Sequence, residues 1–419
     1  MWAGGARAVY GDWLHASNDA TVLIYSHYDV QPVDPEDLWK SPAFKPSMRD
    51  KDRIYARGAS DDKGPLLATL YALKSVFASN TSGLPVNVKM LIEGEEEIGS
   101  PTLDSIFEAY GKSLLSADYV FSADGGQASR QAPLCLLAGL RGNAALEVTV
   151  TRDGGDLHSG EYGGAVANPL HHLVHILSDL RDYDSGKITV DGFYDDVDEM
   201  SEDDKNDVKM MEKYTPWKAV QKALGTEAVF GEKGFTPFEQ VWFRPTLEIV
   251  GMIGGYTEEG VKTVLPRRAS AKISCRLVTS QRAGDILQKL QAHIEKIESY
   301  GLTVTAEPLH FKCDPVRVKK DGLGNAAAVK VLKSIKNETP IYIYSGGSVP
   351  FVEIAQRRID RDAVTLTFNY PGTNVHGPNE FVFLPDLMTT QIAYIRLLYQ
   401  LDNMHQEAQS QGSTVKDEL

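Results

Sequence analysis

Cysteine, positive charge and long apolar runs are all scarce in this chain. Only three of its 419 residues are cysteines, and Cys135, Cys275 and Cys313 form no CxxC pair. The sequence therefore predicts neither a disulfide framework nor a zinc–thiolate site, and the thiols are expected in the core or on the surface of a protein from a reducing compartment. No segment is apolar over the length of a membrane span, which argues against a membrane partner.

The charge balance excludes a further class of function. A formal net charge of −14 leaves no excess of basic residues for the positive face that nucleic acid requires. The composition is that of a soluble globular protein, and acidic residues are plentiful enough for some to serve as metal ligands.

Both ends of the chain bear on its location. The start, MWAGGARAVYGDW, has no apolar segment of the secretory type. The last four residues, KDEL, match an ER-retention address, which acts only on a chain that enters the ER. A polar tail that ends in these letters by chance is the alternative, so we expect a cytoplasmic protein.

The length of the chain predicts two domains. Residues 1–138 and 312–419 show strand-then-helix segments, such as a buried strand over 21–27 and a helix over 64–79. This rhythm predicts an α/β catalytic domain with a mostly parallel sheet and helices on both faces. Residues 139–311 carry half-exposed strands and amphipathic helices, which predict an inserted α+β lid domain.

Several other elements can be placed by the same patterns. The acidic stretch 184–236 is predicted to be irregular, with 195–214 a solvated helical face or loop. In the last part we expect a strand over 363–370 and a final helix from about 386 to 402.

Imidazole and carboxylate groups stand at five strand-to-loop junctions of the predicted catalytic domain. Ligand sites of open α/β sheets lie beyond the carboxyl ends of the strands, so these side chains are expected to converge. Taken singly, a histidine after a strand is usually a hydrogen-bonded surface residue, and a glutamate run is usually a solvated face. The junctions carry His27 with Asp29, Asp61, Glu95–Glu97, Asp124 and His376.

The donor types indicate a metal centre. Imidazole and carboxylate without cysteine suit zinc, cobalt or manganese. Two histidines and several acids exceed the needs of one tetrahedral ion and match two ions, about 3.5–4 Å apart, bridged by a carboxylate and a water. Asp29 can accept the other N–H of the His27 ring, or else form an Asx turn before Pro32.

Five motifs carry a specific resemblance. HYDVQP, ARGASDDKGP, EGEEEIGS, DLHSGEYGG and GGSVP follow one another in this order. With this order and spacing the chain resembles the M20 metallopeptidases from about residue 20 onward, most closely the cytosolic dipeptidase and carnosinase branch. The resemblance implies a two-domain α/β fold with a lid and a dimeric enzyme.

The resemblance also assigns roles to individual residues. It implies that Asp61 bridges two ions, zinc first and manganese or cobalt otherwise. The general base that takes a proton from the metal-bridged water would be Glu96, while Glu95 would point to solvent. His27 and His376 would each hold one of the two ions, and Glu97 and Asp124 would each complete the ligand shell of one ion.

The lid is expected to supply further groups. By resemblance, His158 reaches over from a partner subunit to stabilise the oxyanion. Without that resemblance, an ordinary turn histidine would be the more usual interpretation. Thr263, Arg276 and Ser348 match positions that hold the substrate's carboxylate. A guanidinium binds a carboxylate through two parallel hydrogen bonds, but Arg276 can also be a surface residue of a strand.

Three departures from the family pattern concern the substrate and the fold. The chain begins about twenty residues before the first metal motif, whereas relatives begin several dozen residues earlier, and a missing helix and strand would expose part of the sheet. IYIYS precedes GGSVP where the dipeptidases carry an Arg-Glu pair. FKCDPVRVKKDG lacks a histidine that carnosinase-like members have.

Three functions are compatible with these observations. The leading one is a di-metal hydrolase that cleaves dipeptides or short peptides with a free C-terminal carboxylate, and DVQP and DDKGP favour it. The second is an N-acyl amino acid deacylase of the same fold. The third is a truncated, inactive paralogue that serves as a binding or dimerising protein.

Overall fold

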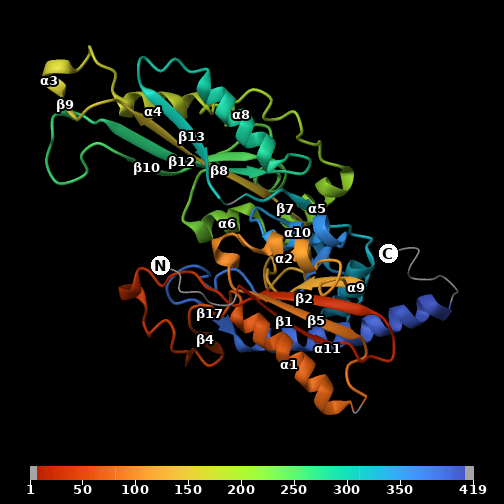
Figure 1. Ribbon diagram of the computed structural model, residues 1–419. Helices are drawn as coiled ribbons and strands as arrows, with labels where there is room; N and C mark the ends of the chain where they lie inside the picture. Colours follow the sequence, from red (N-terminus) through yellow and green to blue (C-terminus); the bar gives the residue numbers. More distant parts are fainter. Residues whose placement is uncertain (1–6, 81, 311, 411–419) are drawn as a thin grey trace.

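The computed structural model describes residues 7–80, 82–310 and 312–410, which form two lobes (Figure 1). The lower lobe in this view contains a five-stranded sheet in the order β1-β5-β2-β6-β16. The last four strands of this order run parallel, and β1 pairs antiparallel with β5 at one edge. The strands are β1 (Ala8–Trp13), β2 (Thr21–His27), β5 (Asn87–Glu93), β6 (Tyr119–Ser122) and β16 (Ala363–Thr365).

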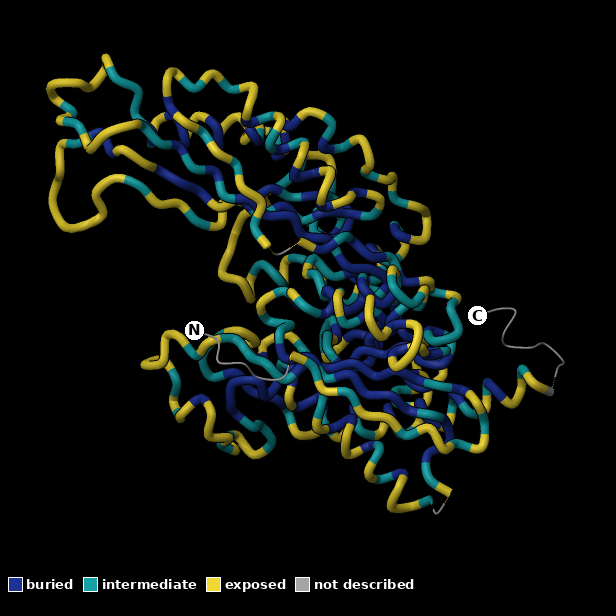
Figure 2. The backbone as a smooth tube through the Cα atoms, in the orientation of Figure 1, coloured by how far each residue is buried: buried dark blue, intermediate teal, exposed yellow. Residues whose placement is uncertain are grey.

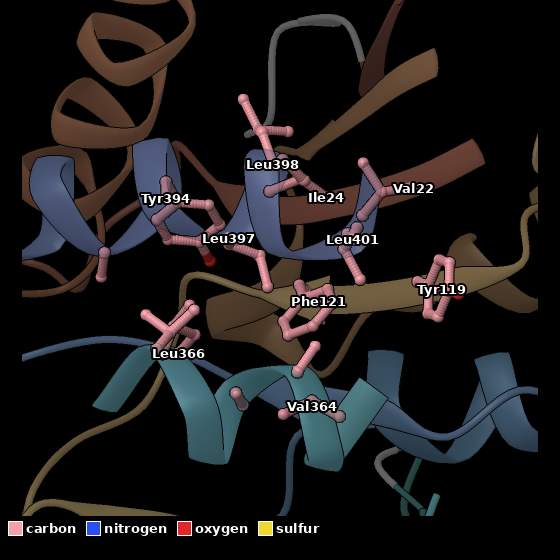
Figure 3. Close-up of a cluster of buried hydrophobic side chains, with 14 of the residues drawn as sticks. Val22, Ile24, Tyr119, Phe121, Val364, Leu366, Tyr394, Leu397, Leu398 and Leu401 are labelled. Carbon is pink, nitrogen blue, oxygen red and sulfur yellow. The ribbon is translucent and has the colours of Figure 1, made fainter. Parts of the chain in front are cut away.

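Helices cover both faces of this sheet, which explains the uninterrupted apolar run of β2. On one face, α1 (Lys63–Ser79), α9 (Leu323–Lys336) and α11 (Leu384–Ser410) pack on Val22, Ile24 and the residues beside them. Figure 3 shows Tyr394, Leu397 and Leu401 of α11 against this layer. On the other face, α2 (Leu103–Tyr110) and α10 (Pro350–Ile359) pack on Leu23 and Tyr25.

Two small sheets extend the lower lobe. One has the order β14-β7-β15 and contains β7 (Cys135–Leu140), β14 (Val316–Arg317) and β15 (Ile341–Ser345). The other has the order β17-β4-β3 and contains β3 (Ser47–Arg49), β4 (Arg53–Tyr55) and β17 (Phe381–Phe383). Two short 3-10 helices, η1 (Glu36–Leu38) and η2 (Glu96–Ile98), lie in the loops.

The upper lobe is an antiparallel sheet in the order β10-β12-β8-β13. Its strands are β8 (Gly142–Thr151), β10 (Thr246–Gly254), β12 (Arg268–Leu277) and β13 (Thr303–Pro308). The helices α4 (Pro169–Asp179) and α8 (Ala283–Glu295) share one core with this sheet. At the tip lie β9 (Leu157–His158), α3 (Ser159–Tyr162) and β11 (Val264–Leu265).

This architecture confirms the predicted fold class, a mostly parallel α/β sheet with helices on both faces and a second α+β lobe. The chain passes between the lobes from β7 to β8 and returns after β13 (Figure 1). The domain boundaries at 138/139 and 311/312 stay a prediction. Figure 2 shows that both lobes have buried interiors, so each forms a core of its own.

The acidic stretch differs from its prediction. Residues 184–236 include α5 (Glu202–Tyr214) and α6 (Trp217–Leu224), and α7 (Pro237–Phe243) follows directly. Although α5 is strongly acidic, its Val208 and Met211 are buried together with Trp242 and Tyr344. The prediction of a merely solvated face was therefore wrong, because the apolar residues recur at helical spacing between the acids and pack against β15.

Three other elements also differ from expectation. The edge strand β1 was not predicted, and it pairs with β5 from Ala8 to Trp13. The strand β16 ends at Thr365 rather than at 370, and α11 is longer at both ends than predicted. Among the described residues, no helix combines the length and apolarity that a membrane crossing requires.

Candidate metal centre

The predicted ligands meet beyond the carboxyl ends of the parallel strands. His27 is the last residue of β2 and is fully buried. Glu96 and Glu97 lie in η2 just after β5, and Asp124 follows β6. Asp61 precedes α1 and His376 lies in the loop before β17, so five distant parts of the sequence contribute to one place.

Asp61 lies between the two imidazoles. Its Oδ1 is 3.0 Å from Nε2 of His27, and its Oδ2 is 2.9 Å from Nε2 of His376. The donor atoms form two groups, His27 with Asp61 and Asp124, and His376 with Asp61 and Glu97; within each group they lie within 4.8 Å of one another. The one residue common to both groups is Asp61, the residue for which the family resemblance implies a bridging role.

Burial and the crowding of charges shift the acidity of this cluster. Burial raises the pKa of Asp124 to about 6, with Asp61 adding to the effect. Burial, reinforced by Asp124, raises the pKa of Glu96 to about 9. Burial alone would raise the pKa of Asp61, but its hydrogen bonds with His27 and His376 hold it well below its usual range.

The two histidines hold protons strongly when only carboxylates surround them. Hydrogen bonds with Asp61 and Glu97 raise the pKa of His376 to about 10. Burial opposes the charge of His27, yet Asp29 and Asp61 keep its pKa well above the ordinary value. The negative charge of so many neighbouring carboxylates has to be balanced by positive charge. Protons on the two imidazoles or bound metal cations can supply it, and the two compete for the same atoms.

Asp29 contacts the ring nitrogen of His27 that faces away from the other ligands. Its Oδ1 is 3.3 Å from Nδ1 of His27, the ring nitrogen that faces away from Asp61. Its carboxylate also accepts hydrogen bonds from the backbone N–H groups of Glu96 (3.2 Å) and Glu97 (2.9 Å). The carboxylate therefore orients the imidazole and joins β2 to η2, instead of only closing a turn before Pro32.

Glu95 was expected to point to solvent, and this was wrong. Its carboxylate accepts a hydrogen bond from the Thr102 hydroxyl and lies 3.7 Å from the Arg7 guanidinium, and its side chain is only 16% exposed. It does point away from the two metal-ligand groups, because successive residues at the start of η2 face different ways.

Glu380 was missed by the sequence analysis. Its buried carboxylate accepts hydrogen bonds from the backbone N–H groups of Gly58 (2.9 Å), Ser60 (2.8 Å) and Asp61 (3.1 Å). It also pairs with the Arg57 guanidinium at 2.8 Å. Glu380, which lies in the same segment as His376, thus fixes the loop that carries Asp61. The only sign of this role in the sequence was an acidic residue four positions after His376.

Gln31 was missed as well. Its backbone N–H and side-chain amide donate to the two carboxylate oxygens of Glu97, at 3.1 and 2.7 Å. This residue belongs to the HYDVQP motif, and it fixes the orientation of a predicted ligand from the adjacent strand end.

The predicted lid residues fall into two separate places. His158 and Thr263 lie together at the exposed tip of the upper lobe, where Val264 pairs with His158 and Ser159 N–H donates to the Thr263 carbonyl at 3.0 Å. Figure 1 shows this tip at the end of the upper lobe that is remote from β2. The structure therefore does not bring His158 or Thr263 to the ligand groups of the same chain.

Arg276 and Ser348 lie together at the other end of β12, where the lobes join. Nη1 of Arg276 is 3.2 Å from the Ser348 hydroxyl, which donates to the Arg141 carbonyl at 2.6 Å. Within the described part of the chain, no carboxylate forms an ion pair with Arg276. Its half-buried guanidinium thus remains able to bind an anion, unlike a surface arginine paired with a neighbour.

A pocket of about 300 Å³ adjoins the cluster. Asp61 and Asp124 form one wall, and residues 125–127 and 369–375 form the rest. Gln127 N–H donates to the Asn369 carbonyl at 2.7 Å, which joins the two loops. Ligand pockets in proteins start at roughly this size, so a small molecule can reach the carboxylates here.

The three cysteines lie elsewhere. All are buried and free, and burial raises the pKa of Cys135 to about 11. They are core thiols and contribute no donor to the two ligand groups.

Comparison with known proteins agrees with this geometry. Residues 23–400 match the family described as Peptidase family M20/M25/M40. The human Beta-Ala-His dipeptidase is 31% identical over 86% of this chain and 70% of its own length. The Cys-Gly metallodipeptidase dug1 of Schizosaccharomyces pombe is 28% identical over 91% of this chain and 79% of its own.

Solved structures extend the likeness to three dimensions. The M20 family metallo-carboxypeptidase Sso-CP2 from Sulfolobus solfataricus superposes with a TM-score of 0.84 at 33% identity, over 94% of this chain and 88% of that one. A convergent cluster of histidines and carboxylates, a two-lobed fold and these relatives lead to one conclusion. The chain belongs to peptidase family M20/M25/M40 and is a metallopeptidase of its dipeptidase-like branch.

Proposed function

We propose that this metallopeptidase hydrolyses dipeptides or short peptides with a free C-terminal carboxylate at a centre of two divalent ions. The observation that carries the proposal is the position of Asp61, shared by two groups that each contain one histidine and one further acid. The names of its relatives, a Beta-Ala-His dipeptidase and a Cys-Gly metallodipeptidase, support the substrate class.

The residues present fit two such ions. One would be held by His27, Asp61 and Asp124, and the other by His376, Asp61 and Glu97. Imidazole and carboxylate donors without thiolate suit Zn²⁺, with Mn²⁺ or Co²⁺ as alternatives. Such a pair of ions supplies an activated water and polarises the scissile carbonyl.

Glu96 is proposed as the general base. It is half-buried beside Asp124, Asp61 and Glu97, whose charges contribute to its raised pKa, while Glu95 faces Arg7. A carboxylate in this position accepts the proton of the attacking water and delivers it to the leaving amine. Asp29 acts through His27, which it orients.

The substrate's carboxylate is proposed to bind Arg276 and Ser348. Both residues lie at the junction of the lobes of the same chain. The Arg276 guanidinium contacts the Ser348 hydroxyl but forms no ion pair with a carboxylate among the described residues. A free C-terminus would provide the missing anion.

His158 and Thr263 are proposed to act on the site of a second subunit. Their place at the exposed lid tip supports this, because they are remote from the ligand groups of their own chain (Figure 1). His158 would donate to the oxyanion that forms during attack, and Thr263 would contact the substrate's carboxylate.

The free edge of β10 is proposed as the surface through which the lids dimerise. Its outer side is unpaired among the described strands, and it exposes Ile249, Val250, Met252 and Ile253, the last at 70%. An apolar edge strand favours pairing with another strand, and antiparallel pairing with its own copy satisfies a twofold axis.

A cytoplasmic location is the last part of the proposal. The three cysteines are free, which suits a reducing compartment. The KDEL tail lies outside the described residues.

The experiment that tests the substrate class compares three compounds of matched side chains. A dipeptide, its C-terminal amide and the corresponding N-acetyl amino acid are assayed with the zinc-loaded protein. We expect kcat/KM for the amide to be about 10²-fold lower than for the dipeptide, since the half-buried guanidinium of Arg276 would be left without an anion. Faster hydrolysis of the N-acetyl amino acid would replace the proposal with a deacylase.

A further inference from the structure

Three histidines lie together on one helix of the upper lobe, apart from the metal centre. His171, His172 and His175 belong to α4, and Figure 1 places α4 in the upper lobe while β2 lies in the lower one. Residues three and four apart on a helix are neighbours on its surface, so His175 is adjacent to both others. All three line a cavity of about 660 Å³.

His172 is the buried member of this group. It is only 7% exposed, and its Nε2 has no hydrogen-bond partner among the described residues. An unpaired polar atom in such a place costs free energy unless a ligand satisfies it. Burial, together with His175, lowers the pKa of His172.

His171 and His175 are the exposed members. Both are exposed, and neither side chain forms a hydrogen bond within the described part of the chain. The ring centroids of His172 and His175 are 6.3 Å apart, with 57° between the planes. Two imidazoles on one ion, each bound at about 2.0–2.1 Å, need a separation of roughly 5 Å. Among the described residues, the donor groups that already lie within 4.8 Å of one another are those of the metal centre, so the exposed side chains of His171 and His175 both have to rotate toward His172 to close this site.

The chemistry of the cavity wall selects the ligand. Its other lining residues are Gly163–Asn168, Leu265 and Tyr300, which include no carboxylate. Hard cations such as Mg²⁺ and Ca²⁺ require oxygen ligands and are disfavoured. Imidazole donors without carboxylate suit Zn²⁺, Ni²⁺, Cu²⁺ or Co²⁺.

We propose that His171, His172 and His175 bind one divalent transition-metal ion, separate from the two ions of the metal centre. Imidazoles must be neutral to act as ligands, so this site empties as the pH falls through the range in which histidines protonate. The proposal does not depend on the peptidase activity.

The test is the Zn²⁺ stoichiometry of the whole protein, measured by equilibrium dialysis against free Zn²⁺ and plasma mass spectrometry. The double variant His171→Ala/His175→Ala removes the two exposed ligands, which are not part of the core. His310→Ala is the matched control, because His310 is an exposed histidine outside this cavity. We expect the double variant to bind one equivalent less than the wild type, and His310→Ala to bind as many as the wild type.

Two results would overturn the site. One is equal stoichiometry in the wild type and the double variant, and the other is an equal loss in His310→Ala, which would mark nonspecific surface binding. The difference between the variants stays interpretable if the metal centre itself fails to load, because the wild type would then bind one ion and the double variant none.

Discussion

Glu96 and Glu95 are neighbours in the sequence with opposite surroundings. Glu96 is half-buried beside Asp124 and Asp61, while Glu95 contacts Thr102 and Arg7. We expect Glu96→Gln to lower kcat on a dipeptide by about 10²–10⁴-fold, the usual contribution of a general base, with the metal content unchanged. Glu95→Gln is the matched control and should retain activity, and undiminished hydrolysis by Glu96→Gln would remove Glu96 from its assigned role.

Glu380 illustrates a residue that acts only through others. It neutralises the buried guanidinium of Arg57 and accepts three backbone N–H groups of the Asp61 loop. We expect Glu380→Gln to lower the free energy of unfolding by about 3–5 kcal/mol, because a buried charge loses its partner. Denaturant unfolding measures this, and Glu338→Gln, which removes an exposed ion pair with Lys336, should cost less than about 1 kcal/mol.

The predictability of the site follows from how each residue acts. His27, Asp61, Asp124 and His376 could be predicted because each follows or precedes a recognisable element with an unusual donor. Glu380 and Gln31 could not, because they reach the site through hydrogen bonds to residues that are distant in sequence. Separating Glu96 from Glu95 and Glu97 needed the family resemblance, since periodicity alone does not say which carboxylate faces the centre.

At the scale of elements, α5 shows where sequence patterns give an incomplete answer. The strand over 21–27 and the helix over 64–79 were found because burial on both faces, or on one face, leaves a clear apolar pattern. In α5 the acids dominate the composition, yet Asp204 itself is buried and binds Arg317 and Tyr344. Its partners come from β14 and β15, which no local pattern reveals.

The same contact gives α5 a dependence on pH. Burial would raise the pKa of Asp204, but its hydrogen bonds with Arg317, Ser201 and Tyr344 lower it below the ordinary value. A carboxyl with a lowered folded-state pKa stabilises the fold above its unfolded pKa of about 3.9 and loses that contribution as the pH falls through the folded value.

We therefore expect Asp204→Asn to be less stable than the wild type at pH 7, and the difference to shrink below about pH 4. Urea unfolding followed at several pH values measures it. Asp203→Asn, on the exposed side of the same helix, is the control, and its free energy of unfolding should change with pH in the same way as that of the wild type. A stability difference between Asp204→Asn and the wild type that does not change with pH would contradict the account.

At the scale of the whole molecule, the metal-ligand groups and the lid tip belong to different lobes. The metal-ligand groups lie in the lower lobe, and His158 lies at the far tip of the upper one (Figure 1). The two-lobed fold could be predicted from the strand and helix rhythm, whereas the distance between these groups could not. If a second subunit completes the site, two variants that are inactive alone should restore activity in a mixed dimer.

Mixing two inactive variants tests that arrangement. Glu96→Gln lacks the base and His158→Ala lacks the oxyanion donor, and each alone should lose at least about 10²-fold in kcat. After the subunits are exchanged in equal amounts, we expect about a quarter of wild-type activity, since half of the dimers are mixed and each restores one site. No recovery, although sedimentation shows mixed dimers, would mean that His158 does not act across the interface.

The metal content per chain tests the central claim most directly. It should be measured by plasma mass spectrometry on protein purified without chelator, in the His171→Ala/His175→Ala background so that the ions of the metal centre are counted alone. The account predicts close to two zinc or manganese ions per chain, falling with His376→Ala. A content close to zero, even after incubation with excess metal, would contradict the two-ion centre and favour an inactive paralogue that serves as a binding protein.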